Sequence, residues 1–201
     1  DFIIYDYNGN DVTRMFDIIL RAGELHYYAY KITFVTENVF KTYDGTPLTN
    51  TNWSIIGALK EGHKIDNDLL VFTGNQVNIG VSKNTAKIFI VDENGNDVTD
   101  MYYISKNFGN LVVNPRPITI QSKSVTKSYD GTPLICHEYE ITNGSLVEGD
   151  VLSVIISGTQ TSIGKSENII ESIIIKNASG DITNNYIIDY VNGRLTVTPA
   201  K

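Results

Sequence analysis

The chain of 201 residues is poor in cysteine, histidine and cationic side chains, and each shortage excludes a class of protein. One cysteine cannot build a disulfide framework, and with only three histidines a Cys/His metal site is not expected. Sixteen Lys and Arg against 23 Asp and Glu give a net charge of −7, whereas duplex binding needs clustered cations. We therefore expect no nucleic-acid partner. No apolar run reaches the ~18 residues of a membrane span, so membrane insertion is not expected either.

The sequence does contain an internal repeat. Asn8-Gly9-Asn10-Asp11-Val12-Thr13 returns at residues 94–99, an offset of 97 − 11 = 86. Tyr43-Asp44-Gly45-Thr46-Pro47-Leu48 returns at residues 129–134, and 129 − 43 is again 86. A weaker third copy of the first motif lies at residues 180–183. Two matching hexapeptides in one register indicate a tandem array.

The repeat boundaries follow from the proline-containing joints. Asn114-Pro115-Arg116-Pro117 separates one repeat from the next, and Thr198-Pro199 holds the corresponding place later in the chain. This phase predicts whole β-sandwich repeats at residues 30–115 and 116–201, with residues 1–29 as the C-terminal strands of a preceding, truncated repeat. A short joint that contains proline is semi-rigid.

Residues 1–29 lead to a separate expectation. The chain has no initiator Met or signal peptide, so it is expected to be a piece of a longer chain. The segment is apolar, and an isolated hairpin is marginally stable in water. We therefore expect polypeptide outside residues 30–201 to complete it, either an upstream part of a longer protein or a neighbouring molecule.

Short β-rich runs separated by Gly, Asn and Asp predict strands throughout. The expected strands are residues 31–35, 53–57, 69–72 and 87–91 in the first repeat, and residues 118–120, 151–156, 173–175, 186–191 and 194–197 in the second. No helical stripe is convincing, and residues 166–176 are interpreted as a strand because their counterpart in the first repeat is one. About seven strands in ~85 residues predict an all-β fold of tandem Ig-like antiparallel β-sandwich modules.

Three turns are expected to close hairpins. Asn192-Gly193 is the favoured hairpin dipeptide. Its equivalents are Phe108-Gly109 and Ala22-Gly23, which share only the glycine. A shared glycine suggests a positive φ, so valine at position 109 or 193 is expected to destabilise its repeat.

These motifs together resemble a known family. Lys41-x-Tyr43-Asp44-Gly45-Thr46-Pro47-Leu48, then Gly57-x-Leu59-x-x-Gly62, Gly95-x-Asp97-Val98-Thr99-x-x-Tyr102-x-Ile104 and Gly109-x-Leu111-x-Val113-x-Pro115 resemble the MBG and YDG-type repeat domains of large bacterial surface proteins. The second repeat matches through Lys127, Tyr129 to Leu134, Gly144, Leu146, Gly149, Gly180, Asp181, Thr183, Tyr186, Gly193, Leu195 and Pro199. The pattern departs where His63 stands against Asp150, and where Ala29-Tyr30-Lys31 stands against Pro115-Arg116-Pro117. The resemblance implies a surface-exposed, Ig-like stalk or fibre repeat, with no catalytic residues and no defined ligand.

Three motifs resemble binding sites and are interpreted as structural. The Tyr-Asp-Gly-Thr-Pro segments predict a turn followed by a strand, with the rings of Tyr43 and Tyr129 capping the core and their hydroxyls on polar partners. Residues 92–97 resemble part of a Ca²⁺ loop, but the glycine is misplaced and no closing Glu follows, so an Asx turn is preferred. Residues 158–166 have one residue too many between their glycines for a phosphate-binding loop and precede a strand candidate.

No residue set indicates catalysis. Cys136, His26, His63 and His137 have Asn50, Val112, Asp150 and Thr51 at the aligned positions, so none belongs to the repeat. Adjacent residues of a strand point to opposite faces, which separates His137 from Cys136. We predict that the chain is not an enzyme and has no catalytic, cofactor-binding or metal-binding residues and no cofactor.

Two functional hypotheses remain foremost. The first is a structural spacer on a bacterial cell surface, extracellular, which holds an adhesive part away from the cell and contacts adjacent repeats or neighbouring subunits. The second is a module that itself binds a host glycan, host protein or matrix ligand, because tyrosine provides 12 of 20 aromatic residues. Exposed clusters at Tyr5 and Tyr7, or at Tyr27, Tyr28 and Tyr30, would favour binding. A subunit that self-assembles into a filament by strand complementation is a further alternative.

Overall fold

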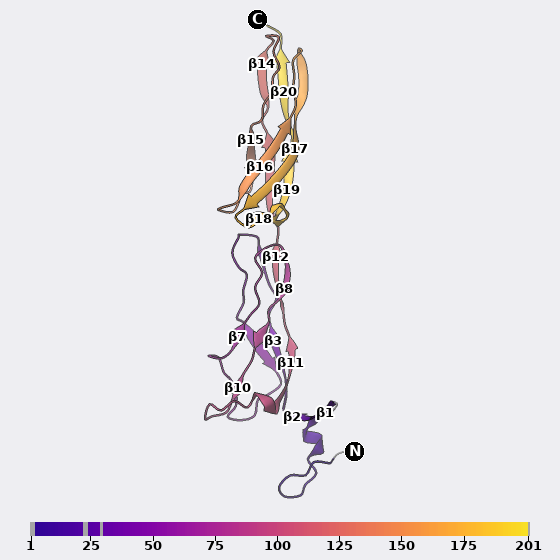
Figure 1. Ribbon diagram of the computed structural model, residues 1–201, viewed down its shortest axis with the longest axis vertical. Helices are drawn as coiled ribbons and strands as arrows, with labels where there is room; N and C mark the ends of the chain where they lie inside the picture. The colour runs from indigo at the N-terminus through magenta and orange to yellow at the C-terminus, as the bar shows by residue number, and fades with distance from the viewer. Residues whose placement is uncertain (1–2, 22–23, 29, 201) are drawn as a thin grey trace. The chain divides into compact units, whose positions relative to one another are not determined.

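The computed structural model describes the backbone of residues 3–21, 24–28 and 30–200, and the side chains of residues 3–16 and 30–200 (Figure 1). The expected Ala22-Gly23 turn, and the side chains of His26, Tyr27 and Tyr28, lie outside the described residues. Strands dominate the described part, which confirms the all-β class. Its helices are three short 3₁₀ turns, and none is long enough to cross a membrane.

The chain divides into two compact units. Unit 1 comprises Asp1–Phe40, Pro47–Gln76 and Gly80–Val112. Unit 2 comprises Val113–Lys201 together with two short earlier segments, Lys41–Thr46 and Val77–Ile79. The second unit therefore incorporates one complete Tyr-Asp-Gly loop from the earlier part of the sequence.

The elements of residues 1–114 are η1 Thr13–Met15, β1 Asp17–Arg21, β2 Glu24–Tyr28, β3 Tyr30–Thr36, β4 Val39–Thr42, β5 Trp53–Ile56, β6 Lys64–Ile65, β7 Val71–Phe72, β8 Gly80–Lys83, β9 Ala86–Lys87, β10 Ile90–Val91, η2 Thr99–Met101, β11 Tyr102–Asn107 and β12 Asn110–Asn114. Their sheets have the orders β1-β2, β11-β3-β5, β4-β12-β8, β10-β6 and β7-β9. The expected strands at 69–72 and 87–91 are shorter than predicted, since turns and irregular residues interrupt both.

The elements of residues 116–198 are β13 Arg116–Ser122, β14 Val125–Ser128, β15 Tyr139–Asn143, β16 Val151–Ser157, β17 Gly164–Asn177, β18 Gly180–Asp181, η3 Thr183–Asn185, β19 Tyr186–Val191 and β20 Gly193–Thr198. They form a β15-β13-β19 sheet and a β14-β20-β17-β16 sheet, with β18 paired to β17. Residues 166–176, which were predicted to be a strand and not a helix, lie within strand β17.

The outer elements of the two halves correspond, and the middle elements do not. β3 and β13 are 86 residues apart (116 − 30), η2 and η3 are 84 apart (183 − 99), and each opening strand pairs with the strand that follows the 3₁₀ turn. In the middle, the long pair β16 and β17 stands where the first half has the short strands β6 to β10. The expected strand-for-strand match therefore holds only for the outer elements.

The expected antiparallel pairing holds for only part of the sheets. β3 pairs parallel with β11, β13 pairs parallel with β19, and β14 pairs parallel with β20. Parallel neighbours need a long crossover, and here the intervening strands of the module provide it. The opening strand of each module therefore lies beside its next-to-last strand, and the second strand lies beside the last.

The predicted hairpins at Phe108-Gly109 and Asn192-Gly193 are also wrong. β19 ends at Val191 and lies in the β13 sheet, whereas β20 begins at Gly193 and lies in the β14 sheet. β11 and β12 are divided between two sheets in the same way. The Asn-Gly pair thus marks a change of sheet. Only β1 and β2 pair with each other, antiparallel, across the equivalent position.

Alternation along the opening strands builds each core. Ile118, Ile120 and Ser122 of β13 are buried, while the residues between them are more exposed, as expected for a strand with one inward face. β3 buries Ile32, Phe34 and Thr36 in the same pattern. In unit 1, the ring of Phe34 stacks on Trp53 with centroids 5.3 Å apart. Burying each such large side chain contributes about 1.5–3 kcal/mol.

Candidate functional site

The Tyr-Asp-Gly loops have the same internal hydrogen bonds in both copies. The Asp44 carboxylate accepts from the Thr46 backbone N–H at 2.9 Å and from Lys41 Nζ at 2.6 Å. Lys41 also donates to the carbonyl and hydroxyl of Thr46. Gly45 has a φ of 77°, which glycine adopts without strain. These hydrogen bonds join residues at most five positions apart, so the loop conformation depends on local contacts, and the expected turn is confirmed.

The second copy repeats the arrangement. The Asp130 carboxylate accepts from the Thr132 N–H at 2.9 Å and from Lys127 Nζ at 2.8 Å, and Gly131 has a φ of 78°. The lysine hydrogen bond is the main reason that the pKa of both carboxyls is lowered, for Asp44 to about 2. At neutral pH each carboxyl is therefore ionised and forms an ion pair with the lysine of its own loop.

The lysine-aspartate tie predicts a titration result. A folded pKa below the ordinary value of 3.8 means that the tie stabilises the loop above about pH 3.8 and that this contribution is lost as the pH falls toward about 2. Lys127→Met is expected to return the pKa of Asp130 toward 3.8 while the Asp44 pKa stays near 2. Carboxyl ¹³C NMR titration measures both groups in one sample. Equal pKa values for Asp130 in the variant and the original chain would contradict the tie.

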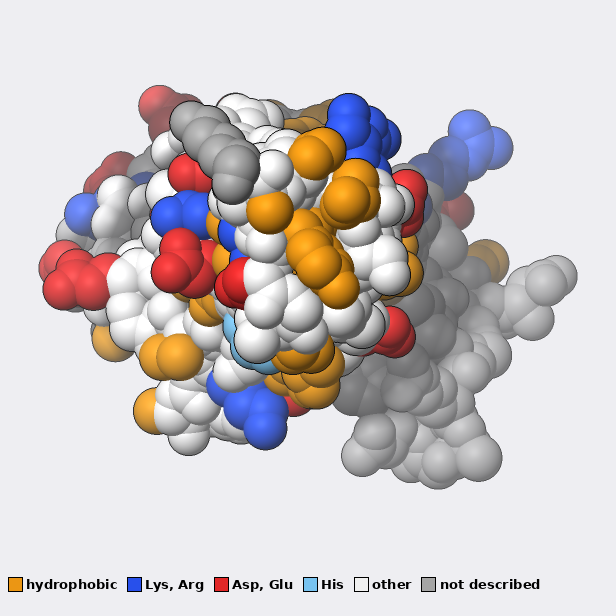
Figure 2. Space-filling view, turned by 90° about the horizontal axis from the view of Figure 1, so that it is seen from above, with side chains coloured by type: hydrophobic (Ala, Val, Ile, Leu, Met, Phe, Trp, Pro, Cys, Tyr) orange, Lys and Arg blue, Asp and Glu red, His pale blue; other side chains and the backbone are white. Residues whose placement is uncertain are grey.

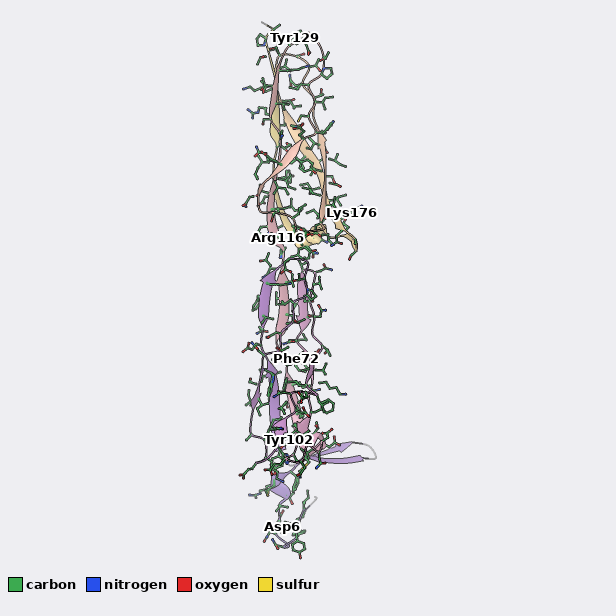
Figure 3. All side chains as sticks on the ribbon, turned by 90° about the vertical axis from the view of Figure 1, so that its left-hand side faces the viewer. Asp6, Phe72, Tyr102, Arg116, Tyr129 and Lys176 are labelled. Atoms are coloured by element: carbon green, nitrogen blue, oxygen red, sulfur yellow. The ribbon has the colours of Figure 1, made fainter. Side chains whose placement is uncertain are left out.

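The two motif tyrosines have different surroundings. Tyr43 is buried, at 1% exposure, whereas Tyr129 is 45% exposed. The prediction that both rings cap the core was therefore wrong for Tyr129. Within unit 2, Tyr129 lies at one end, and Arg116 and Lys176 lie at the other (Figure 3). The exposed copy is at the end of unit 2 where β14 and β20 lie together (Figure 1).

Tyr43 belongs to unit 2 and packs there against residues that come later in the sequence. Its ring meets the ring of Tyr186 edge-on, with centroids 5.6 Å apart. Burial and the nearby charge of Asp150 raise the pKa of the Tyr43 hydroxyl. Gly45 approaches Val147 so closely that an added Cβ would lie 3.0 Å from its side chain. We call Val147, Asp150, Asn185 and Tyr186 the receiving surface.

Asn185 also holds the second early segment of unit 2. Its amide oxygen accepts from the Ile79 backbone N–H at 2.9 Å, and its amide nitrogen donates to the side-chain oxygen of Asn78 at 2.9 Å. Asn185 is only 3% exposed, so these partners satisfy a buried amide. The receiving surface thus recognises both a tyrosine loop and a neighbouring backbone segment.

Tyr186 is fixed by its hydroxyl. The oxygen accepts from the Val147 N–H at 3.0 Å and donates to the Asp150 carboxylate at 2.5 Å. Burial, followed by this carboxylate, raises the pKa of Tyr186. In unit 1 the equivalent Tyr102 accepts from the Lys60 N–H at 3.1 Å and contacts His63 Nδ1 at 2.8 Å. Sequence analysis noted His63 as a departure from the repeat, and the structure shows that it replaces Asp150 as the tyrosine partner.

This difference predicts unequal costs for removing the two hydroxyls. Tyr186→Phe breaks a hydrogen bond to a carboxylate and is expected to lower the free energy of unfolding of unit 2 by about 2 kcal/mol. Tyr102→Phe breaks a bond to an imidazole and is expected to cost unit 1 about 1 kcal/mol. Amide hydrogen exchange, followed on peptides of each unit, measures the two separately. An equal loss in both variants would contradict the role of Asp150.

In each unit, one buried hydroxyl group hydrogen-bonds two backbone groups and so joins the sheets; we call this pair of bonds the buried hydroxyl tie. Ser122 Oγ donates to the Asn168 carbonyl at 2.5 Å and accepts from the Gly193 N–H at 2.8 Å. In unit 1, Thr36 Oγ1 donates to the Asn84 carbonyl and accepts from the Gly109 N–H, both at 2.9 Å. These hydrogen bonds were not predicted from the sequence. The repeated glycine was their only strong signal.

The carboxylates of the acidic turns accept hydrogen bonds within their own turns. Asp92 Oδ1 accepts from the backbone N–H groups of Asn94 and Asn96, each at 2.9 Å, and Asp97 accepts from the N–H and hydroxyl of Thr99. The side-chain amide of Asn96, which donates to Asp92 Oδ2 at 3.0 Å, is the main reason that the pKa of Asp92 is lowered, and the Thr99 hydroxyl is the main reason that the pKa of Asp97 is lowered. The Asx-turn interpretation is confirmed. Among the described residues, no group of three His, Cys, Asp or Glu side chains could hold a metal ion.

The remaining candidates have structural partners. Gly164 opens strand β17, and Gln160 forms a bridge with Leu134, so residues 158–166 make a turn into a strand. His137 Nδ1 bonds the Ile156 carbonyl at 3.0 Å, and Cys136 is a half-buried free thiol. Tyr30 packs on Tyr102 with centroids 5.3 Å apart, whereas Tyr5 and Tyr7 are exposed.

Comparison with known proteins adds no assignment: no protein-family model matches the chain, and no curated protein sequence matches it.

Proposed function

We propose that the chain is a structural repeat region, a stalk or fibre segment of a bacterial cell-surface protein, built from tandem Ig-like β-sandwich modules of about 85 residues. It spaces or presents an adhesive part of the protein outside the cell and has no enzymatic activity. The observation that carries this proposal is the repetition of one set of structural ties. The lysine-aspartate loop, the anchored tyrosine and the buried hydroxyl tie each occur twice at matching positions. Repeated groups that satisfy one another support a mechanical role better than a chemical one.

Force spectroscopy on the whole chain tests the spacer function. Two modules in series should unfold in two separate events, because each has its own core. Each event should lengthen the chain by about 30 nm, since ~85 residues extend at about 3.5 Å each. A single event for the whole chain, or extension without resolved events, would argue against serial modules.

A second candidate function is binding of a host glycan or protein by the repeats themselves. Tyr5 and Tyr7 favour it, since they are 61% and 103% exposed, and exposed tyrosine is common in binding surfaces. A glycan and matrix-protein screen with the whole chain tests it, with a Tyr5→Ser, Tyr7→Ser variant as the matched control. Binding that disappears in the variant would favour this function over the spacer.

A further inference from the structure

One hexapeptide of this chain is present in a bound and an exposed form. Residues 43–48 and 129–134 have the same sequence, and their loops have the same internal hydrogen bonds. The first tyrosine is buried on the receiving surface of unit 2, and the second is exposed. Hydrophobic side chains gather at the end of unit 2 that carries Tyr129 (Figures 2 and 3). Ile163 and Ile135 are also exposed, at 58% and 52%. Ile163 precedes Gly164, which pairs with Val197, and Ile135 follows Leu134, which bridges to Gln160.

The exposed loop has the groups that the receiving surface recognises. Gly131 stands where Gly45 packs against Val147, and nothing lies within 4 Å of a Cβ added to it. Ile163 is the equivalent of Ile79, since each lies three residues after an aligned glutamine, Gln160 or Gln76. The backbone N–H of Ile79 donates to Asn185. The neighbouring residue is Ser162, which offers a hydroxyl where Asn78 offers an amide oxygen.

The loop of residues 127–132 needs little change of conformation in order to dock. Lys127 and Thr132 already hold Asp130, so the loop conformation that unit 2 recognises in residues 43–46 exists in the exposed copy. A preformed loop loses less conformational entropy on binding than one that must fold. Burying the Tyr129 ring and Ile163 removes apolar surface from water, which is favourable.

We propose that the loop of residues 127–132, with Ile163, is a docking surface for a further copy of the 116–200 module, which it contacts through that copy's receiving surface. The inference rests on the proposed function, because it assigns the contact by which repeats of this type join. The occupant must present Asp150, Asn185 and Tyr186 or their equivalents. Unit 1 offers a poorer surface, since His63 and Met101 stand in place of Asp150 and Asn185.

An extended chain tests the proposal. Residues 1–199 are followed directly by a second copy of residues 116–201, so that Pro199 precedes Arg116 as Pro115 does in the original chain. The added copy carries Phe at its own position 129, which leaves Tyr43 and Tyr129 as the only motif tyrosines. Nitration by tetranitromethane is followed by peptide mass spectrometry. Tyr129 is expected to react at least about tenfold more slowly than in the original chain, as a docked fraction of nine in ten requires.

Two controls identify the groups responsible. Tyr43 should stay unreactive in both chains, because it is already buried. An extended chain whose added copy carries Asp150→His and Asn185→Met, the residues of unit 1, should nitrate at Tyr129 within about twofold of the original chain. Amide exchange over the added copy verifies that it has the same fold as residues 116–200.

Two results would overturn the docking surface. One is equal Tyr129 nitration in the original and extended chains. The other is equal protection by the added copy and by its doubly substituted form, which would mean that the receiving residues play no part. The spacer function is judged separately, by the force measurement on the unmodified chain. Two unfolding events with an unprotected Tyr129 would reject the docking and keep the spacer.

Discussion

Gly193→Ala is expected to lower the free energy of unfolding of unit 2 by about 3 kcal/mol or more. A Cβ at this position would lie 2.3 Å from the Ser122 carbonyl oxygen and 2.5 Å from that of Lys123. Both obstacles are backbone atoms, at the end of β13 and in the residue that follows it, so no side-chain rotation can make room. Accommodation requires separating the two sheets, which removes the Gly193 hydrogen bond to Ser122 as well.

Gly131→Ala is the matched control for backbone conformation. Gly131 has a φ of 78° with open space around it, so alanine there adds strain of about 1–2 kcal/mol and no collision. Amide exchange over residues 116–200 measures both variants. A larger loss for Gly131→Ala than for Gly193→Ala would show that close approach is not the reason for Gly193.

Gly109 and Gly193 are sensitive positions because of close contacts and not because of a positive φ. Sequence analysis expected substitutions of Gly109 and Gly193 to destabilise because φ would be positive. Neither glycine is among those with a positive φ. Gly109 has the same close contact as Gly193, with a Cβ that would lie 2.2 Å from the Glu37 carbonyl oxygen. A glycine that recurs in a repeat shows that a side chain is not tolerated at that position. The sequence alone does not tell whether the reason is a positive φ or a close contact with neighbouring atoms.

Local patterns predicted some strands, such as residues 118–120 and 151–156, because such patterns depend on neighbouring residues, but other strands, such as β11 and β15, were not among those expected. The alternation along β13 and the Asp-Gly turns were both readable from short windows. Sheet assignment was not readable, because β19 and β20 pair with strands distant in sequence. Asn192-Gly193 therefore looked like a hairpin, although it lies between two sheets.

The candidate site shows the same division. The Tyr-Asp-Gly loops were found from their repetition, and their internal geometry followed from turn chemistry. Their different exposures were not predictable, since identical hexapeptides have different tertiary surroundings. Asn185 also escaped notice because its equivalent in the first repeat is Met101. A residue that binds a segment distant in sequence need not recur with the repeat.

Ser122→Ala is expected to cost unit 2 about 2–4 kcal/mol. Ser122 is fully buried, and its hydroxyl satisfies one acceptor, the Asn168 carbonyl, and one donor, the Gly193 N–H. Alanine leaves both backbone groups unpaired, and each unpaired buried group costs about 1–3 kcal/mol. The side chain of Asn168, which is also fully buried, donates to the Lys123 carbonyl and cannot replace the missing hydroxyl without losing that bond.

Ser122→Thr is the matched control, because Thr36 occupies the equivalent position in unit 1 with the same two hydrogen bonds. The hydroxyl is kept, so the loss should be below about 1 kcal/mol, and a methyl group is the only added volume. Exchange of the Gly193 amide gives the most direct readout. It should accelerate strongly in Ser122→Ala and stay slow in Ser122→Thr. Equal exchange of this amide in both variants would mean that the hydroxyl does not hold the two sheets together.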